Sequence, residues 1–174
     1  MRVNKIISWA SVVLWMSLIF YLSHQPATES SELSTGISEV IIKMVESIAP
    51  NVDFHLQDLN HIVRKNAHFI AYFVLGVLTL NALRRSGIRG GRSVVIALIV
   101  CVLFAISDEV HQLFIPGRSG EVRDVLIDSV GSSTGIGVYL LISKLISWRN
   151  SRKNVSTGSK GTVLLLPFLK SVIF

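Results

Sequence analysis

The stretch SDEVHQLFIPGRSGEVRDVLID, residues 107–128, lies between two strongly apolar runs and decides how this chain folds. It starts with the polar end of one apolar run, and Pro116-Gly117 then breaks the helical pattern. Gly120 allows the chain to reverse direction a second time. Asp124 and Asp128 follow, spaced i, i+4 at the start of the next apolar run. The stretch therefore predicts a helix end, a turn and a helix start, all at one level of a helical bundle.

The composition is that of a membrane protein. Of 174 residues 50% are hydrophobic and 16% charged, and the mean hydropathy is +0.56. The net charge of +6 would suit nucleic acid only if the basic residues lined a soluble face. They cluster instead at the ends of apolar runs, so we exclude nucleic acid and expect anionic lipid head groups as neighbours. The single cysteine, Cys101, lies within an apolar run and is interpreted as a small residue that either faces lipid or packs against another helix.

Four apolar runs are long enough to cross a bilayer, at about residues 6–23, 62–83, 93–112 and 124–148. The first is interpreted as an uncleaved span, because it is long for a signal peptide and HQPA is a poor cleavage site. We predict an all-α, four-transmembrane-helix bundle over residues 1–148. Residues 149–174 are predicted to form a basic cytoplasmic tail.

The segment between the first two spans has the pattern of an amphipathic helix. Its apolar residues follow one helical face, and Pro50 follows its end. It is too polar to span, so we predict an interfacial helix in the first extracytoplasmic loop. The apolar positions are Leu33, Ile37, Val40, Ile41, Met44, Val45 and Ile48.

The distribution of Lys and Arg predicts the orientation. Basic residues are dense at the N-terminus, in the loop 84–92 and after residue 148. The positive-inside rule then predicts a multi-pass protein of the inner (cytoplasmic) membrane, with both termini inside and the two longer polar loops outside.

This topology places three polar sets at the outer ends of the helices. The residues of each set, named below, lie on one face of their helix. Glu109 lies about 100° round the helix from Asp108. Ionised groups facing lipid cost roughly 2.5–3.5 kcal/mol each, so they are expected to face one another or a wet cavity. We predict an outward-facing charged pocket, with a purely structural ion-pair network as the alternative. The sets are Lys65, His68 and Tyr72; Asp108, His111 and Gln112; and Asp124 and Asp128.

Each of these residue types suggests a role. Asp108, Glu109 and His111 are candidates for acid–base catalysis. Arg118, which follows Pro-Gly, is a candidate for holding a phosphate or carboxylate bidentately. The two histidines beside acids could hold a metal, but no HExxH or other tight spacing identifies a metal or cofactor. The remaining candidates for binding are Lys65, His68, Tyr72, Gln112, Asp124 and Asp128. Further along, Gly131 and Gly135 form a small-xxx-small surface that predicts close approach of a neighbouring helix.

The motifs VRKNAHFIAYFVLG and SDEVHQLFIPGRSGEVRDVLIDSVGSSTG resemble the VanZ-like family of small bacterial membrane proteins, over about residues 10–140. The resemblance implies a link to low-level teicoplanin resistance and the importance of the polar positions above, without assigning their roles. Many members carry an acidic residue where this chain has Ala71.

Three functions are consistent with the sequence. The first is a pocket for an anionic cell-envelope lipid or lipid-linked precursor, with Arg118 and Lys65 holding the anion. The second is a membrane-embedded hydrolase or transferase that acts on a phospholipid or polyprenyl carrier. The third is a structural bundle that assembles with an envelope partner. The sequence identifies neither the ligand nor the oligomeric state.

Overall fold

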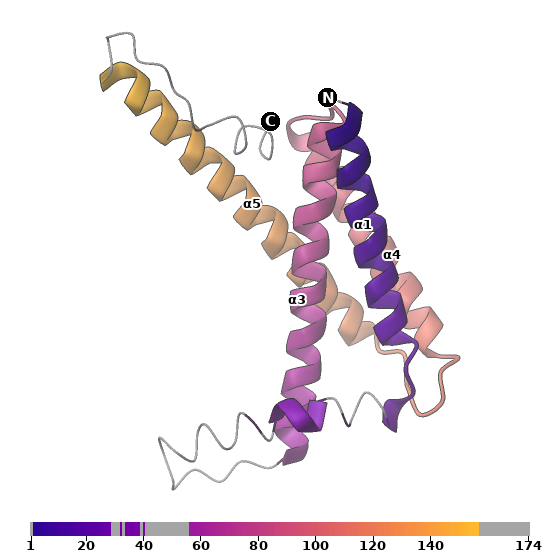
Figure 1. The fold of residues 1–174 in the computed structure, drawn as a ribbon. Helices are drawn as coiled ribbons and strands as arrows, with labels where there is room; N and C mark the ends of the chain where they lie inside the picture. The colour runs from indigo at the N-terminus through magenta and orange to yellow at the C-terminus, as the bar shows by residue number, and fades with distance from the viewer. Residues whose placement is uncertain (1, 29–31, 33, 39, 41–55, 157–174) are drawn as a thin grey trace, which may run out of the picture.

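The fold is that of a computed structural model, which describes residues 2–28, 32, 34–38, 40 and 56–156. Its long helices are α1 (Arg2–Ser23), α3 (Leu56–Arg85), α4 (Gly91–Gln112) and α5 (Val122–Ser156) (Figure 1). Each contains a stretch long and apolar enough to cross a membrane: Val3–Ser23, Leu59–Arg85, Gly91–Gln112 and Val122–Asn150. The described residues contain no strand, so the prediction of an all-α bundle with four membrane-spanning helices is confirmed.

The helices alternate in direction along the chain, which brings four helix ends together. The C-terminal turns of α1 and α4 lie beside the N-terminal turns of α3 and α5, at the lower end of Figure 1. The loop 113–121 closes this end, which we call the polar end of the bundle. The N-terminus and the far end of α5 lie at the opposite end.

Helix α3 is the centre of the bundle, and α5 crosses it obliquely while running in the same direction (Figure 1). A Cβ added to Gly131 would lie 2.5 Å from the Phe69 carbonyl oxygen, and one added to Gly135 would lie 2.1 Å from that of Phe73. On α3, a Cβ at Gly76 would lie 2.4 Å from the Ser132 carbonyl oxygen. The close approach predicted from Gly131 and Gly135 is thus confirmed, and it fixes the register of the two helices.

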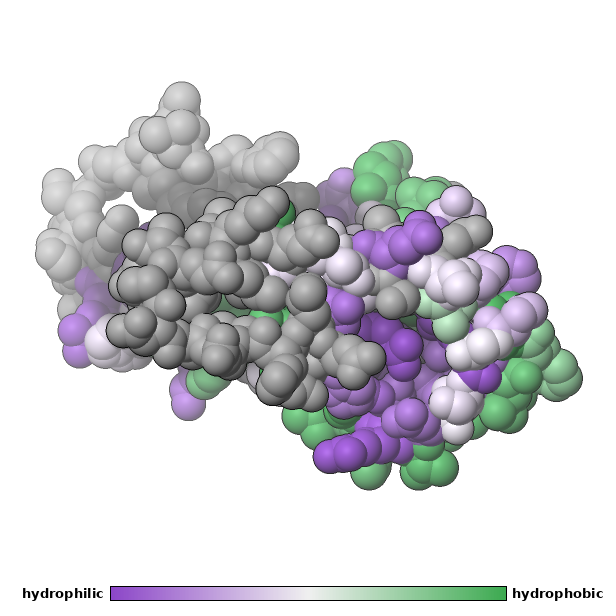
Figure 2. Space-filling view, turned by 90° about the horizontal axis from the view of Figure 1, so that it is seen from below, coloured by the Kyte–Doolittle hydropathy of each residue, from purple (hydrophilic) through white to green (hydrophobic). Residues whose placement is uncertain are grey.

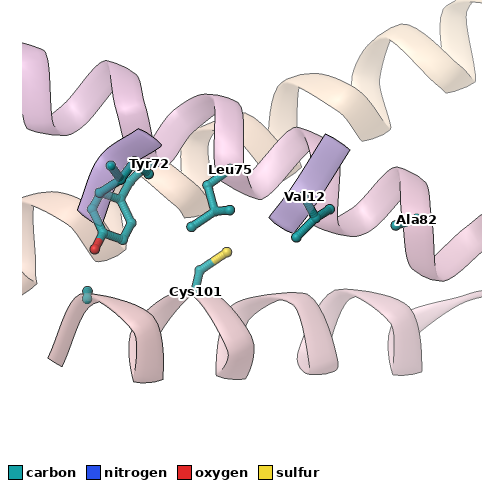
Figure 3. Packing of buried hydrophobic residues seen from close by; sticks show 7 residues of the cluster. Val12, Tyr72, Leu75, Ala82 and Cys101 are labelled. Atoms are coloured by element: carbon teal, nitrogen blue, oxygen red, sulfur yellow. The ribbon is translucent and has the colours of Figure 1, made fainter. Parts of the chain in front are cut away.

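The core between α1, α3 and α4 is apolar. Val12, Tyr72, Leu75, Ala82 and Cys101 are buried in one cluster (Figure 3). The burial of Cys101 supports packing rather than contact with lipid.

Two tryptophans of α1 form hydrogen bonds to α3 and to the loop that follows α3. Trp15 Nε1 donates to the Ala71 carbonyl oxygen at 2.8 Å, and Trp9 Nε1 donates to Ser86 Oγ at 2.9 Å. The opposite face of α1 is apolar and largely exposed. Such a face is expected of a helix that contacts lipid.

The end of α5 differs from the predicted one. Helix α5 continues past Trp148 to Ser156, so the first part of the predicted tail is helical, and the Arg152 guanidinium lies 3.7 Å from the centre of the Trp148 ring. Of the predicted interfacial helix, residues 32, 34–38 and 40 are helical. Its remaining positions, and residues 157–174, lie outside the described residues.

Candidate polar site between the helix ends

Acidic side chains from two helices are buried at the polar end. Seen from that end, hydrophilic residues gather over the helix ends, with hydrophobic residues at the periphery (Figure 2). Asp108 is 1% exposed and Asp128 is 0% exposed, although both are carboxylic acids. Glu109 and Asp124 are buried as well. Buried acids of this kind need partners, because desolvation of an unpaired charge is costly.

Lys65 is the partner of one of these acids. Its Nζ forms an ion pair with Asp124 of α5 and another, at 3.3 Å, with Glu121 of the loop. The Asp124 side chain is only 5% exposed, so this pair lies mostly away from solvent. Lys65 therefore joins α3 to the start of α5, and it does not line the cavity described below.

His68 lies one helical turn further along the same face of α3. Its Nδ1 is 3.5 Å from Asp128 Oδ1 on α5. Glu109 of α4 approaches from the other side, where its Oε2 accepts a 2.8 Å hydrogen bond from the backbone N–H of Glu121. His68, Glu109 and Asp128 can each offer a ligand atom within 4.8 Å of the other two.

Asp108 and Gln112 connect α4 to α1. Gln112 Nε2 donates to Ser23 Oγ at 2.8 Å and lies 3.4 Å from Asp108 Oδ2. The shared helical face of Asp108 and Gln112 predicted from their i, i+4 spacing is thus confirmed.

Several buried oxygens in this region have no hydrogen-bond partner among the described residues. They belong to side chains that converge from α3, α4 and α5. Each such atom costs about 1–3 kcal/mol if it stays unpaired, so the cluster is a candidate site for a bound water, ion or ligand. The atoms are the Tyr72 hydroxyl, Asp108 Oδ1, Glu109 Oε1 and both carboxylate oxygens of Asp128.

A cavity of about 170 Å³ lies between α1 and α3, with Asp108 of α4 contributing to its wall. Its lining is mostly apolar, from residues such as Ile19, Ile37 and Val63. Its polar lining comes from Arg64, His68, Tyr72, Asp108 and Arg118, with Ser23, Gln25 and Ser34. The cavity thus combines an apolar wall with charged groups of both signs.

Arg118 and Arg64 supply the positive charge of this cavity. Neither forms an ion pair within 4.0 Å among the described residues, and the buried Arg118 Nε has no hydrogen-bond partner there. Burial, and to a smaller extent the nearby Arg64, lower the pKa of the Arg118 guanidinium. Asp108 and Glu109 lie close enough to act on Arg118 in the opposite sense. Two neighbouring guanidinium groups that no acid holds in an ion pair within 4.0 Å, among the described residues, form a candidate site for an anion.

His111 lies elsewhere at the polar end. Its Nε2 is 3.0 Å from His24 Nδ1, and its ring stacks on Phe20 with the ring centres 4.2 Å apart. It faces α1 and lines no part of the cavity, so the structure does not gather Asp108, Glu109 and His111 around one point.

Three contributing residues were not among the sequence candidates. Arg64 lies next to Lys65 and Glu121 lies within the opening stretch, but nothing in their spacing separates them from ordinary interfacial charges. Ser23 ends the first apolar run in SHQP, which lies at the level of the polar sets, but nothing in its spacing indicates a contact with Gln112. Only the packing of α1 and the loop 113–121 brings these three to the site.

The fold and the site together define a multi-pass membrane protein whose buried acidic groups, among the described residues, are concentrated at one end of the bundle. A protein-family model described as VanZ/LLP1 matches residues 8–143, and the chain belongs to this family. The resemblance seen in the two sequence motifs is thereby confirmed. No curated protein and no solved structure matches the chain.

Proposed function

We propose that this protein binds the head group of an anionic cell-envelope lipid, or of a lipid-linked cell-wall precursor, in the cavity between α1 and α3. The observation that carries this proposal is the pair of arginines, Arg64 and Arg118, in a cavity whose other lining is mainly apolar. An amphiphile with a phosphate group matches both halves of such a cavity.

The arginine pair favours a phosphate. Each guanidinium can form two parallel hydrogen bonds to an oxyanion, and a buried phosphate would relieve the repulsion between the two cations. The unpartnered Nε of Arg118 supplies one donor for it. Arg64 takes the place that the sequence suggested for Lys65, because Lys65 is occupied by Asp124 and Glu121.

The remainder of the cavity fits the rest of a lipid. Ile19, Leu22 and Val63 offer a surface for a hydrocarbon chain. Asp108 and His68 lie in the same lining and can accept hydrogen bonds from hydroxyl groups of a head group. Phosphatidylglycerol, which carries both a phosphate and free hydroxyls, is a suitable test ligand.

The proposed orientation places this cavity at the outer leaflet of the cytoplasmic membrane, because the basic residues are concentrated at the opposite end of the bundle. There a bound lipid or precursor would be altered or shielded from an extracellular antibiotic. This would account for the link to teicoplanin resistance that the family resemblance implies.

The proposal is tested by lipid binding to purified protein in detergent, measured by native mass spectrometry. Arg118→Gln should weaken phosphatidylglycerol binding by about tenfold, the equivalent of one charge-assisted hydrogen bond. Ala67→Phe should do the same by narrowing the cavity. Phosphatidylcholine, which is zwitterionic, should bind more weakly to the wild type.

Two matched variants control for general effects. Arg123→Gln removes an exposed arginine at the same end, and Ile70→Phe enlarges an exposed residue of α3 outside the cavity. Both should bind phosphatidylglycerol as the wild type does. Equal affinities for Arg118→Gln and wild type would overturn the proposal. Conversion of the bound lipid into a product would assign the hydrolase or transferase function instead.

A further inference from the structure

The buried cluster of His68, Glu109 and Asp128 has the composition of a metal site. It takes one ligand from each of α3, α4 and α5, and its ligand atoms all lie within 4.8 Å of one another. Zn–N and Zn–O bonds are about 2.0–2.2 Å, so two ligands of one ion lie at most about 4.4 Å apart. Small side-chain rotations would therefore bring the three groups onto one ion.

The hydrogen bonding leaves these carboxylates available as ligands. Glu109 is anchored through Oε2 to the Glu121 N–H, which leaves its buried Oε1 unpartnered. Asp128 is fully buried, and neither of its oxygens accepts a hydrogen bond from the described residues. An ordered water could satisfy one such oxygen, but it would not compensate the charge.

The charge balance points to a cation. Lys65 forms its ion pairs with Asp124 and Glu121. No lysine or arginine among the described residues lies within ion-pair distance of Asp108, Glu109 or Asp128. Among the described residues, the one ion-pair contact of these three largely buried carboxylates is that of Asp128 with His68, at 3.5 Å. A divalent ion would neutralise two of these charges and use the unpartnered oxygens as ligands.

We propose that His68, Glu109 and Asp128 bind a divalent first-row transition metal ion, with Zn²⁺ as the ion to test first. One imidazole and two carboxylates are typical of ions such as Zn²⁺ and Mn²⁺, whereas Ca²⁺ and Mg²⁺ prefer oxygen ligands alone. Three protein ligands leave a coordination position for water or for an oxygen of a bound molecule.

The metal site adjoins the lipid cavity, because His68 belongs to both. A phosphate held by Arg118 could therefore complete the coordination of the ion. The metal proposal does not depend on that contact, since its ligands come from the protein. The two proposals are separated by Arg118→Gln, which should lose lipid affinity while its metal content stays unchanged.

The test uses full-length protein purified in detergent through a tag without histidine, loaded with Zn²⁺ and desalted. The metal content is then measured by inductively coupled plasma mass spectrometry. The wild type should retain one Zn²⁺ per chain, while Asp128→Asn and Glu109→Gln should each lower the affinity by at least about 100-fold. His111→Gln, which removes the histidine that faces His24, should retain the ion and serves as the matched control.

A second measurement needs only the wild type, in case a variant fails to fold. Zn²⁺ should raise the unfolding temperature, and X-ray absorption at the zinc edge should show nitrogen and oxygen neighbours without sulfur. A wild type that retains no Zn²⁺ or Mn²⁺ after loading would overturn the proposal. So would a sulfur neighbour, which would place the ion at Cys101, or equal loss of zinc in His111→Gln.

Discussion

Lys65 in the third turn of α3 and Asp124 in the first turn of α5 form an ion pair that joins these two helices. The two side chains are 12% and 5% exposed, so the pair is shielded from water. A shielded pair contributes little compared with an apolar contact, but the loss of one partner leaves the other charge buried and uncompensated.

We therefore expect Lys65→Met to destabilise the protein by about 3–5 kcal/mol. The unfolding temperature in detergent, followed by tryptophan fluorescence, should fall accordingly. The double variant Lys65→Met/Asp124→Leu should recover part of the loss, because it removes both charges. Lys144→Met, at an exposed position further along α5, should change little. Equal unfolding temperatures for Lys65→Met and Lys144→Met would show that the ion pair is not important for stability.

The contact between α3 and α5 gives a second prediction. Gly135→Ala places a methyl group 2.1 Å from the Phe73 carbonyl oxygen, whereas Gly137→Ala meets nothing within 4 Å. Because the obstacle is backbone, the helices must separate, at a cost of about 1–3 kcal/mol or more. Size-exclusion profiles and unfolding temperatures should therefore be impaired for Gly135→Ala alone. If both variants behave alike, the close approach of α5 to α3 at Gly135 is wrong.

The burial of Cys101 predicts its reactivity. The thiol is 0% exposed, within the cluster that contains Tyr72 and Leu75 (Figure 3). Maleimide-polyethylene glycol should therefore fail to modify the folded wild type and should modify it fully after denaturation in SDS. Ser119→Cys adds a thiol in the exposed loop and should label without denaturation. Rapid labelling of the native wild type would contradict the packing of α4 against α1 and α3.

The orientation is tested with single cysteines placed in a Cys101→Ala background. Ser119→Cys lies in the loop of the polar end, and Arg89→Cys lies in the basic loop at the opposite end. Because basic loops stay in the cytoplasm, a membrane-impermeant maleimide applied to intact cells should label the first and not the second. Permeabilised cells, in which both should react, provide the control. The reverse pattern would place the polar end inside.

Much of the fold could be predicted because it depends on properties that the sequence states directly. The four apolar runs are long enough to span, so the hydrophobic effect alone specifies four helices. The i, i+4 spacing of Gly131 and Gly135 predicted the close contact of α5 with a neighbouring helix, which is α3. The end of α5 was less predictable, because Arg149 and Arg152 suggest a loop while Arg152 lies against the Trp148 ring on a continuing helix.

The site was predictable in its location and only partly in its organisation. Helical periodicity put Lys65 and His68 on one face of α3, and Asp124 and Asp128 on one face of α5, and both pairs meet as that spacing implies. Periodicity cannot give the rotation of one helix against another. Periodicity put Glu109 and His111 on different faces of α4, but it could not show that Glu109 faces His68 while His111 faces His24.

By itself, then, the sequence determined the number of spans, their helical character and the end of the bundle that carries the polar groups, since each follows from local composition and spacing. The tertiary structure decided which charges are satisfied. Lys65 neutralises Asp124, whereas Arg118 and the carboxylates of Asp128 and Glu109 keep atoms without a hydrogen-bond partner in the described part of the chain. Partners are assigned only when four helices and a loop pack together, because ion pairs and metal ligands depend on distances between atoms far apart in the chain.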